Sequence, residues 1–481
     1  MNRKKTIFLL SFLAVAFLSS AQIDYSASQI AYSSLSMSQT NPVLGTARYS
    51  GMAGAMGALG GDASTMRDNP AGLGIYRSSD FTLTSNFSIA NDNSVGFNIN
   101  NFAIVLNLLH TNNQTGYITS SFGIGYNRLK NFKRYSDLGW DNLGHSMIDY
   151  IADGYAPAYL TNDAFEVGLF DENGPWFGYN PETNTFDQVS NQTRYSEEGS
   201  IGEWNFSYGV NVSNRFYFGL SAGFVSLDYR VKTLYDEWIT NNFNEYWYLD
   251  NYYEANGNGF NFKFGAIAAL TDFMRVGLAF HTPTFYSIDE YLSENIGYID
   301  DTFKRPREAF PRSNLQTPLK LQGSLGFIIG KTAIIGLEYQ FEDFSAMRFS
   351  SNGILDQGSK DIINSEMNVT HTAKVGAEVR IVDGLSLRGG FAFVSNPSTE
   401  LSKSVYTNPK YFQSQPLVQP QNTFYYTGGI GYKSNSFYAD LAFVHQVRNE
   451  TFFQYLPQEE VAPFDLTLHN SNIMATVGVR F

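Results

Sequence analysis

The sequence predicts an all-β fold, a transmembrane antiparallel β-barrel of about 14 strands with an N-terminal plug, or hatch, inside its lumen. Three observations predict it. Apolar and polar residues alternate in short runs from Asp80 to the end of the chain. The connections between these runs are alternately short and long. A segment crowded with Gly and Ala, residues 43–79, precedes the first run.

The composition agrees with a barrel. The 481 residues include 40 Phe and 31 Tyr against 32 Lys plus Arg, and membrane barrels have this mixed character because each strand is apolar on one face only. The chain has no Cys, which excludes disulfides and thiolate metal sites. The net charge of −13 argues against a nucleic-acid partner, since nucleic acid attracts clusters of Lys and Arg.

Residues 1–21 are predicted to be a secretory signal peptide. Three basic residues at positions 3–5 precede an apolar core at 7–18 and a small-residue cleavage site at 19–21. The apolar run is too short for a spanning helix, which needs about 20 residues. No other stretch is apolar enough to span a membrane as a helix, so an exported membrane protein with this sequence has to be a barrel. We therefore expect it in the bacterial outer membrane.

Residues 22–78 are predicted to form the plug. Residues 22–39 are polar and Ser-rich and predict one short helix or none. In residues 51–61 every third residue is Gly, and small side chains let a backbone pack closely against a surrounding wall. A floppy periplasmic linker is the alternative, but such linkers carry Ser rather than Met, Ala and Leu. The residues predicted to form the plug motif are Gly51, Gly54, Gly57, Gly60, Gly61, Asn69, Pro70 and Ala71.

Residues 79–481 are predicted to form the barrel. In one run Trp204, Phe206 and Tyr208 alternate with polar or small residues, as a lipid-facing wall requires. A soluble β-sandwich also alternates, so periodicity alone does not decide. The predicted strands lie near 79–91, 97–109, 117–131, 201–213, 214–233, 256–271, 272–289, 318–330, 331–349, 367–382, 384–396, 422–433, 436–449 and 470–481.

The lengths of the connections distinguish the two folds. Connections after even strands are short, whereas those after odd strands are long except for residues 92–96. The long connections are predicted at 132–200, 234–255, 290–317, 350–366, 397–421 and 450–469. One rim of tight turns and one rim of long loops is typical of outer-membrane barrels, and a sandwich has no reason to keep this order.

Four features together resemble the FadL-type outer-membrane transporters of long-chain fatty acids and other hydrophobic compounds. They are the Gly/Ala segment ending at residues 69–71, the hairpins at 259–283 and 375–393, and the final strand, which ends in Phe481. The resemblance implies a fourteen-stranded barrel with an N-terminal hatch and release of cargo sideways through a gap in the wall. The chain departs from the family in a longer segment before the barrel and in different outer loops.

The function expected from this resemblance is passive transport of hydrophobic small molecules such as long-chain fatty acids. A haemin-binding or adhesive surface protein and a polar-solute porin are the alternatives. No nucleophile elbow, phosphate-binding Gly loop or HExxH motif is present, so no enzyme is expected, and the six His are scattered. We expect no metal and no cofactor, a monomer, and two partners, the hydrophobic ligand and outer-membrane lipid.

Charged residues within the predicted strands should point into the lumen, because Arg or Lys on the lipid face costs about 2–4 kcal/mol at the midplane. They are Lys263, Arg275, Lys320, Glu338, Lys374, Glu378, Arg380, Arg388, Asp440 and Arg480. Most are expected to form cross-strand ion pairs or to bond the plug. The sharper hypothesis is that Arg388, Lys374 and Lys320 bind a ligand carboxylate, the Arg by a bidentate contact.

The predicted outer connections are rich in aromatic residues. Apolar side chains above a membrane either pack on one another or present a binding patch. Packing on one another is the first interpretation, and capture of a hydrophobic ligand is the functional alternative. The residues predicted for capture are Trp176, Phe177, Trp238 and Trp247.

Overall fold

The computed structural model describes residues 26–171, 174–175, 177, 179–180, 185–186, 188–240, 242–298, 302–303, 306–403, 407–409, 412–457 and 463–481. The predicted signal peptide and the candidate Trp176 lie outside the described residues and stay predictions. Within the described ranges, no helix is both long enough and apolar enough to cross a membrane.

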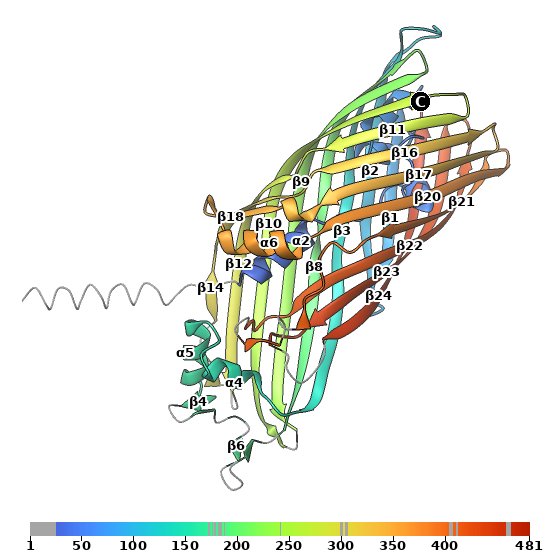
Figure 1. Cartoon of the computed structure of the whole chain (residues 1–481). Helices are drawn as coiled ribbons and strands as arrows, with labels where there is room; N and C mark the ends of the chain where they lie inside the picture. The colour runs from blue at the N-terminus through green and yellow to red at the C-terminus, as the bar shows by residue number, and fades with distance from the viewer. Residues whose placement is uncertain are drawn as a thin grey trace, which may run out of the picture.

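In the described part of the chain, 14 antiparallel strands close into a barrel, as predicted (Figure 1). The strands are β1 (Asp80–Ile89), β2 (Val95–His110), β3 (Tyr117–Leu143), β8 (Val189–Val212), β9 (Phe216–Ile239), β10 (Asn242–Ala269), β11 (Met274–His281) continued by β12 (Phe285–Tyr298), β15 (Arg312–Gln316) continued by β16 (Lys320–Ile329), β17 (Ala333–Asp343), β20 (Val369–Val382), β21 (Leu385–Val394), β22 (Leu417–Lys433), β23 (Phe437–Phe453) and β24 (Phe464–Arg480).

The ring closes between β1 and β24, which pair over the whole of β1. Just before β1, Ser79 N donates to Phe481 O at 3.0 Å, and Phe481 N donates to Ser79 O at 3.1 Å. The last residue of the chain is therefore bonded to the residue that precedes the first strand.

The remaining elements are short. The short strands are β4 (Phe170–Asp171), β5 (Gly174–Pro175), β6 (Tyr179–Asn180), β7 (Thr185–Phe186), β13 (Thr302–Phe303), β14 (Arg307–Ala309), β18 (Arg348–Ser351) and β19 (Ile354–Leu355). The helices that follow the plug in the chain are α4 (Met147–Ala152), α5 (Ala158–Glu166), α6 (Gln357–Glu366) and the 3-10 turn η3 (Phe344–Ala346).

An apolar belt surrounds the half of the barrel that carries the tight turns. On β9 the outward side chains of Phe216, Leu220 and Phe224 are 50–55% exposed, whereas the inward Ser221 is 1% exposed. The outward face becomes polar beyond Phe224, beginning at Ser226. We use the name apolar belt for this outward-facing zone, which extends on β9 from residue 216 to residue 224.

Beyond the apolar belt, five strands continue as an outer extension. It comprises residues 128–143, 189–202, 226–239, 242–257 and 287–298, with α4 and α5 packed at its end, opposite the C-terminus in Figure 1. The prediction of long connections at 234–255 and across 132–200 was therefore wrong in part. Residues 234–255 belong almost entirely to β9 and β10, which pair up to Trp238 and Tyr246.

The N-terminal segment, residues 27–78, runs along the inside of the barrel, and we call it the plug segment. It contains α2 (Ala27–Ser38), α3 (Ala47–Gly51) and the 3-10 turns η1 (Ala63–Met66) and η2 (Pro70–Ile75). Each begins where a side chain caps the free backbone N–H groups. The capping residues are Ser26, Thr46, Asp62 and Asn69. The segment starts at α2, which contacts α6, and ends at β1 on the tight-turn rim.

Glycines of the wall let the plug segment approach the strands backbone to backbone. A Cβ on Gly336 would lie closer than 3.0 Å to the carbonyl oxygen of Ala55. A Cβ on Gly376 would also lie closer than 3.0 Å to the carbonyl oxygen of Met52. Real Cβ atoms essentially never come so near. The same holds against plug atoms at Gly209, Gly219, Gly265 and Gly390. At these six glycine positions, side chains larger than hydrogen are thus excluded.

Candidate functional site

A chain of ion pairs joins the plug segment to the wall at the tight-turn end. Arg48 Nε lies 2.8 Å from Glu378 Oε2, and its Nη2 lies 3.2 Å from Oε1. The same carboxylate accepts Arg388 Nε at 2.6 Å, and Arg388 Nη1 donates to Asp440 at 2.7 Å. Arg388, predicted to bind a ligand carboxylate, is therefore held between two carboxylates of the protein itself.

A second group of charges lies deeper and is fully buried. Lys374 Nζ donates to Glu338 at 2.8 Å and lies 3.9 Å from Asp68 of the plug segment. The backbone N–H of Gly57 donates to Glu338 at 2.9 Å. The hydroxyl of Tyr49 in turn donates to Asp68. Lys374 thus compensates one carboxylate from the wall and one from the plug segment.

The third predicted cation, Lys320, lies 3.4 Å from Glu342. It lines a polar cavity of about 60 Å³ with Lys263 and His281, beneath the interruptions of the wall at 282–284 and 317–319. Each of the three cations predicted for a ligand therefore faces a protein carboxylate. Their binding of a ligand stays a prediction, and the contacts observed are those of the structural alternative.

The predicted plug motif is held by Asn69. Its Oδ1 accepts from Ala71 N at 3.2 Å, and its Nδ2 donates to Gly57 O at 2.8 Å. The same Nδ2 lies 3.5 Å from the carbonyl of Ala266 in the wall. Pro70 occupies the first turn of η2, where its missing N–H costs nothing. One amide therefore links two plug turns to each other and to β10.

Three of the motif glycines are required by their backbone conformation. Gly54, Gly60 and Gly61 have φ of +74°, +60° and +68°, which L-residues rarely adopt. A Cβ on Gly57 would lie closer than 3.0 Å to Glu338, so that glycine is needed for close approach. Gly51 meets Arg388 only at ordinary contact distance, 3.5 Å.

Two of the four aromatic residues predicted for capture are buried in the outer extension. Phe177 is 1% and Trp247 0% exposed, and both belong to the apolar cluster that holds α4 and α5. Trp238 is half-buried on β9, with its ring centroid 6.4 Å from that of Phe243. Phe177 and Trp247 thus pack on other side chains, and Trp176 lies outside the described residues.

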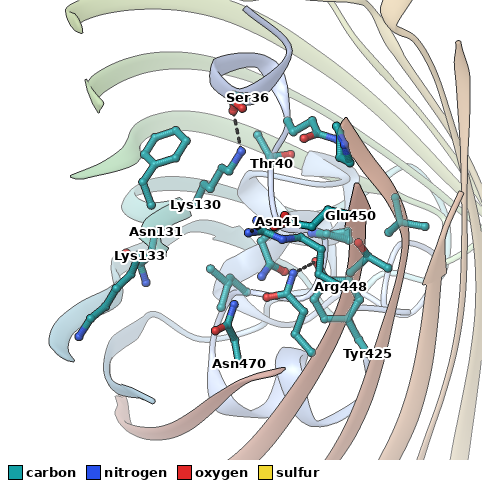
Figure 2. Close-up of a pocket in the computed structure, with 18 of the residues that line it drawn as sticks. Ser36, Thr40, Asn41, Lys130, Asn131, Lys133, Tyr425, Arg448, Glu450 and Asn470 are labelled. Carbon is teal, nitrogen blue, oxygen red and sulfur yellow. Dashed lines mark hydrogen bonds and ion pairs between the residues drawn. The ribbon is translucent and has the colours of Figure 1, made fainter. Parts of the chain in front are cut away.

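A cavity of about 140 Å³ lies between the plug segment and the wall, on the outer side of the plug turns. Figure 2 shows Lys130 and Asn131 on one side of it and Arg448, Glu450 and Tyr425 on the other. Residues 36–44 of the plug segment form its floor. Its lining mixes charged and amide side chains with apolar ones.

Charges in this cavity are only partly compensated. Lys130 Nζ donates to Ser36 O at 2.6 Å, and Arg448 lies 3.4 Å from Glu450, which also pairs with Arg134. Burial lowers the pKa of Lys130 to about 7, against the opposing effect of Glu197. A negative ligand would restore the charged form of this lysine.

The cavity lies behind a break in the wall between β2 and β3. The two strands pair only as far as Asn101 with Asn127, because the β1–β2 hairpin turns back at residues 90–94 and β3 contains a bulge between Arg128 and Lys130. Residues 88–90, at the end of β1 and in its turn, line the cavity on one side of this wall break, and residues 130–133 of β3 line it on the other.

Above the wall break, side chains close the barrel again. The ring of Trp140 on β3 stacks on that of Phe464 on β24, with centroids 4.7 Å apart. Gln454 Nε2 donates to the carbonyl of Leu138 at 2.8 Å. The wall break is therefore a window bounded by the β1–β2 turn on one side and by these contacts on the other.

Sequence reasoning did not single out Lys130 and Arg448. The signal available was the one short outer connection, predicted at 92–96 and observed as a turn closed by Ala90 N donating to Ser94 O at 3.0 Å. The β1–β2 hairpin ends before its neighbours β3 and β24 do. Part of the edge of β3 is therefore unpaired, and the residues opposite this gap line the window.

Four His residues of the described chain make side-chain hydrogen bonds. His281 bonds the carbonyl of Asp68 at 2.6 Å, His371 bonds the hydroxyl of Tyr339 at 2.6 Å, and His469 lies 3.3 Å from His445. Within the described residues there is no group of three or more His, Cys, Asp or Glu able to hold a metal ion.

No protein-family model matches the sequence, and no curated protein sequence matches it. Solved structures do match. A FadL homologue from Pseudomonas aeruginosa superposes with a TM-score of 0.55 and 13% identity, covering 92% of this chain and 99% of that one. The toluene transporters TodX of P. putida and TbuX of Ralstonia pickettii give TM-scores of 0.53 and 0.51 at 11% and 15% identity, each covering 92% of this chain and 99% of its own. The chain thus shares the fold of these proteins, as the resemblance to FadL-type transporters implied.

Proposed function

From a barrel of this fold, crossed inside by its own N-terminal segment, we propose that the protein is a bacterial outer-membrane channel for passive diffusion of hydrophobic small molecules. The apolar belt supports the location, since outward-facing apolar residues on every second position suit a lipid surface. The fold shared with the FadL homologue and the toluene transporters supports the cargo class.

The observation that carries the proposal is the cavity between the plug segment and the wall break. A water-filled pore offers a long acyl chain no favourable path, because each Å² of apolar surface left in water costs about 25 cal/mol. A cavity that opens through the wall gives such a chain a route that bypasses the plug turns. In this route the ligand enters from the outer end, rests in the cavity and leaves sideways between β2 and β3.

The lining of the cavity favours a ligand with an acid group over a plain hydrocarbon. Lys130 and Arg448 approach it from opposite walls, beside the amide side chains of Asn131 and Gln446. Next to toluene these groups would lose their hydrating water and gain no hydrogen bond in exchange. With a carboxylate they would form charge-assisted hydrogen bonds. A long-chain fatty acid combines this head group with an apolar tail, and we assign it as the cargo.

The test is uptake of labelled oleate, with labelled toluene as a second arm, by cells with and without the protein. Ala90→Trp places a large side chain in the cavity and is expected to lower oleate uptake. The matched control is Ala373→Trp, on an exposed outward position of β20, which should leave uptake unchanged.

Two further variants examine the plug segment. Asn69→Ala removes the amide that joins its turns, and deletion of residues 43–78 removes the turns themselves; both are expected to alter uptake and to raise ion leakage. If uptake of oleate is the same with and without the protein and in all variants, the transport proposal is wrong. Faster uptake of toluene than of oleate would contradict only the fatty-acid assignment.

A further inference from the structure

A second cavity, of about 500 Å³, lies at the opposite end of the lumen, on the tight-turn rim. We call it the vestibule. Its lining comes from the plug segment and from β20 to β24, and it contains five cationic and four acidic side chains in a chain whose net charge is −13. The cations are Arg48, Arg380, Arg388, Lys433 and Arg480, and the acids are Asp62, Glu378, Asp383 and Asp440.

Three of the vestibule cations are already paired. Arg48 and Arg388 share Glu378, as described above. Arg480 Nε donates to Asp80 at 3.1 Å, and its guanidinium lies 5.2 Å from the ring centre of Tyr438. These residues form the fixed wall of the vestibule and are not available to a ligand without losing a partner.

Arg380 and Lys433 are different. Both are exposed, and neither side chain makes an ion pair or hydrogen bond within the described residues. Arg380 pairs in register with Ser386, which pairs with Gly431, two residues before Lys433. The two cations therefore project from the same inner face on either side of β21. Lys433 is also within electrostatic reach of the cations Arg480, Arg48 and Arg380, and of the carboxylate of Glu378.

None of the four acidic residues forms an ion pair with either cation within the described residues. Asp62 accepts the hydroxyl of Thr46 at 2.8 Å and the backbone N–H of Ser64 at 2.9 Å, so its carboxylate is directed into the plug segment. Glu378 and Asp440 are held by Arg48 and Arg388. Asp383 is exposed in the turn between β20 and β21 and makes no ion pair within the described residues.

From this arrangement we infer that the vestibule is a binding site for small oxyanions, with Arg380 and Lys433 as its ligand-binding cations. Guanidinium groups bind carboxylates and phosphates by two parallel hydrogen bonds, and an ammonium group adds a mobile point charge. The 500 Å³ volume accommodates such an anion together with its water. The site lies on the far side of the plug turns from the cavity at the wall break, and it does not depend on the transport proposal.

The experiment uses the full chain, purified in detergent micelles and titrated calorimetrically at low ionic strength. Inorganic phosphate is one probe and hexanoate the other, so that a free anion is distinguished from the head group of an amphiphile. The test variant is Arg380→Gln/Lys433→Gln. The matched control is Arg215→Gln/Lys331→Gln, which removes two exposed cations from the same rim outside the vestibule.

We expect saturable binding of at least one probe to the wild type and to the control. Affinity in the test variant should fall at least about tenfold, because two charge-assisted contacts are lost. Binding of phosphate alone identifies free anions as the ligand, and binding of hexanoate identifies carboxylate head groups. No saturable binding of either probe, or an equal loss in the control, would overturn the inference. Uptake of oleate is measured separately and decides only the transport proposal.

Discussion

At the scale of single residues, the buried charges of the lumen act mainly as fastenings between the plug segment and the wall. Lys374 is enclosed with two carboxylates, Glu338 and Asp68, in a region where all three are at most 4% exposed. Removing charges from water costs several kcal/mol per ion, and only close pairing offsets this cost. Position 374 is therefore more important to stability than its place on an ordinary strand suggests.

Lys374→Met should destabilise the folded protein by about 3–5 kcal/mol, because Glu338 is left buried without its cation and Asp68 keeps only Arg67, 3.9 Å away. The measurement is the free energy of unfolding from urea titration in micelles. Lys331→Met, at an exposed turn, is the control and should change that free energy by less than about 0.5 kcal/mol. Equal effects at the two positions would show that the buried pairing does not stabilise the fold.

The direction of these side chains could be predicted from the sequence, but their partners could not. Alternation along one strand fixes which residues face the lumen, and on that basis Lys374, Glu338 and Arg388 were assigned correctly to the inner face. Which cation meets which carboxylate depends on the register of strands far apart in the chain. For the same reason Lys130 and Arg448 were not recognised as neighbours across one cavity.

At the scale of elements, contact between the plug segment and the wall depends on glycines in the strands. Gly336 of β17 faces the carbonyl of Ala55 and Gly376 of β20 faces that of Met52, with no room for a Cβ atom at either position. Gly323 of β16 is different, because a Cβ there would meet nothing within 4 Å. The two kinds of glycine provide a matched comparison within neighbouring strands.

Gly336→Ala should push the plug segment from the wall at a cost of about 1–3 kcal/mol, as overpacking does elsewhere. Single-channel recordings in planar bilayers should then show a higher leak current than the wild type. Gly323→Ala should leave the recordings unchanged. A leak that rises equally in both variants, or in neither, would mean that close packing at residue 336 does not seal the lumen.

Strand positions were predicted well inside the apolar belt and poorly outside it. Within the belt, apolar side chains on every second residue mark each strand, as at Phe216 and Phe224. In the outer extension both faces meet water or other protein, so Asp228, Arg230 and Lys232 take the outward positions and the strand resembles a polar loop. The signal disappears where the outward face leaves the apolar belt, although the hydrogen-bonded ladder continues.

At the scale of the whole molecule, the outer extension should respond to pH through buried carboxyl groups. In the outer extension Glu237 is fully buried, and its carboxylate accepts the N–H of Met147 at 3.3 Å and the hydroxyl of Tyr235 at 2.9 Å. Burial raises the pKa of Glu237 to about 8. Nearby, burial raises the pKa of Glu294 to about 7. Both carboxyls are therefore protonated in the fold at neutral pH or close to it.

The sign of the resulting pH dependence follows from linkage. An unfolded Glu loses its proton near pH 4.3, roughly its ordinary pKa, whereas folded Glu237 keeps it up to about 8. The stabilisation is complete below the unfolded pKa and is lost as the pH rises through about 8. The outer extension should therefore loosen as the pH rises from about 5 to about 8.

Hydrogen exchange of α4 measures this effect. Protection of residues 147–152, corrected for intrinsic exchange, should fall between about pH 5 and about pH 8 in the wild type. Glu237→Gln keeps an acceptor oxygen but cannot ionise, so the fall should be smaller, with the remainder due to Glu294. Protection that is independent of pH in the wild type would contradict the expected ionisation of these carboxyls.

The two backbone hydrogen bonds between Ser79 and Phe481 have a consequence for biogenesis. Because β1 pairs with β24, the cylinder cannot close before β24 is in place. The glycine-rich turns precede the first strand and touch strands on opposite sides of the ring, from β9 to β23. We expect these turns to enter the lumen before the ends meet, so that the barrel closes around the plug segment.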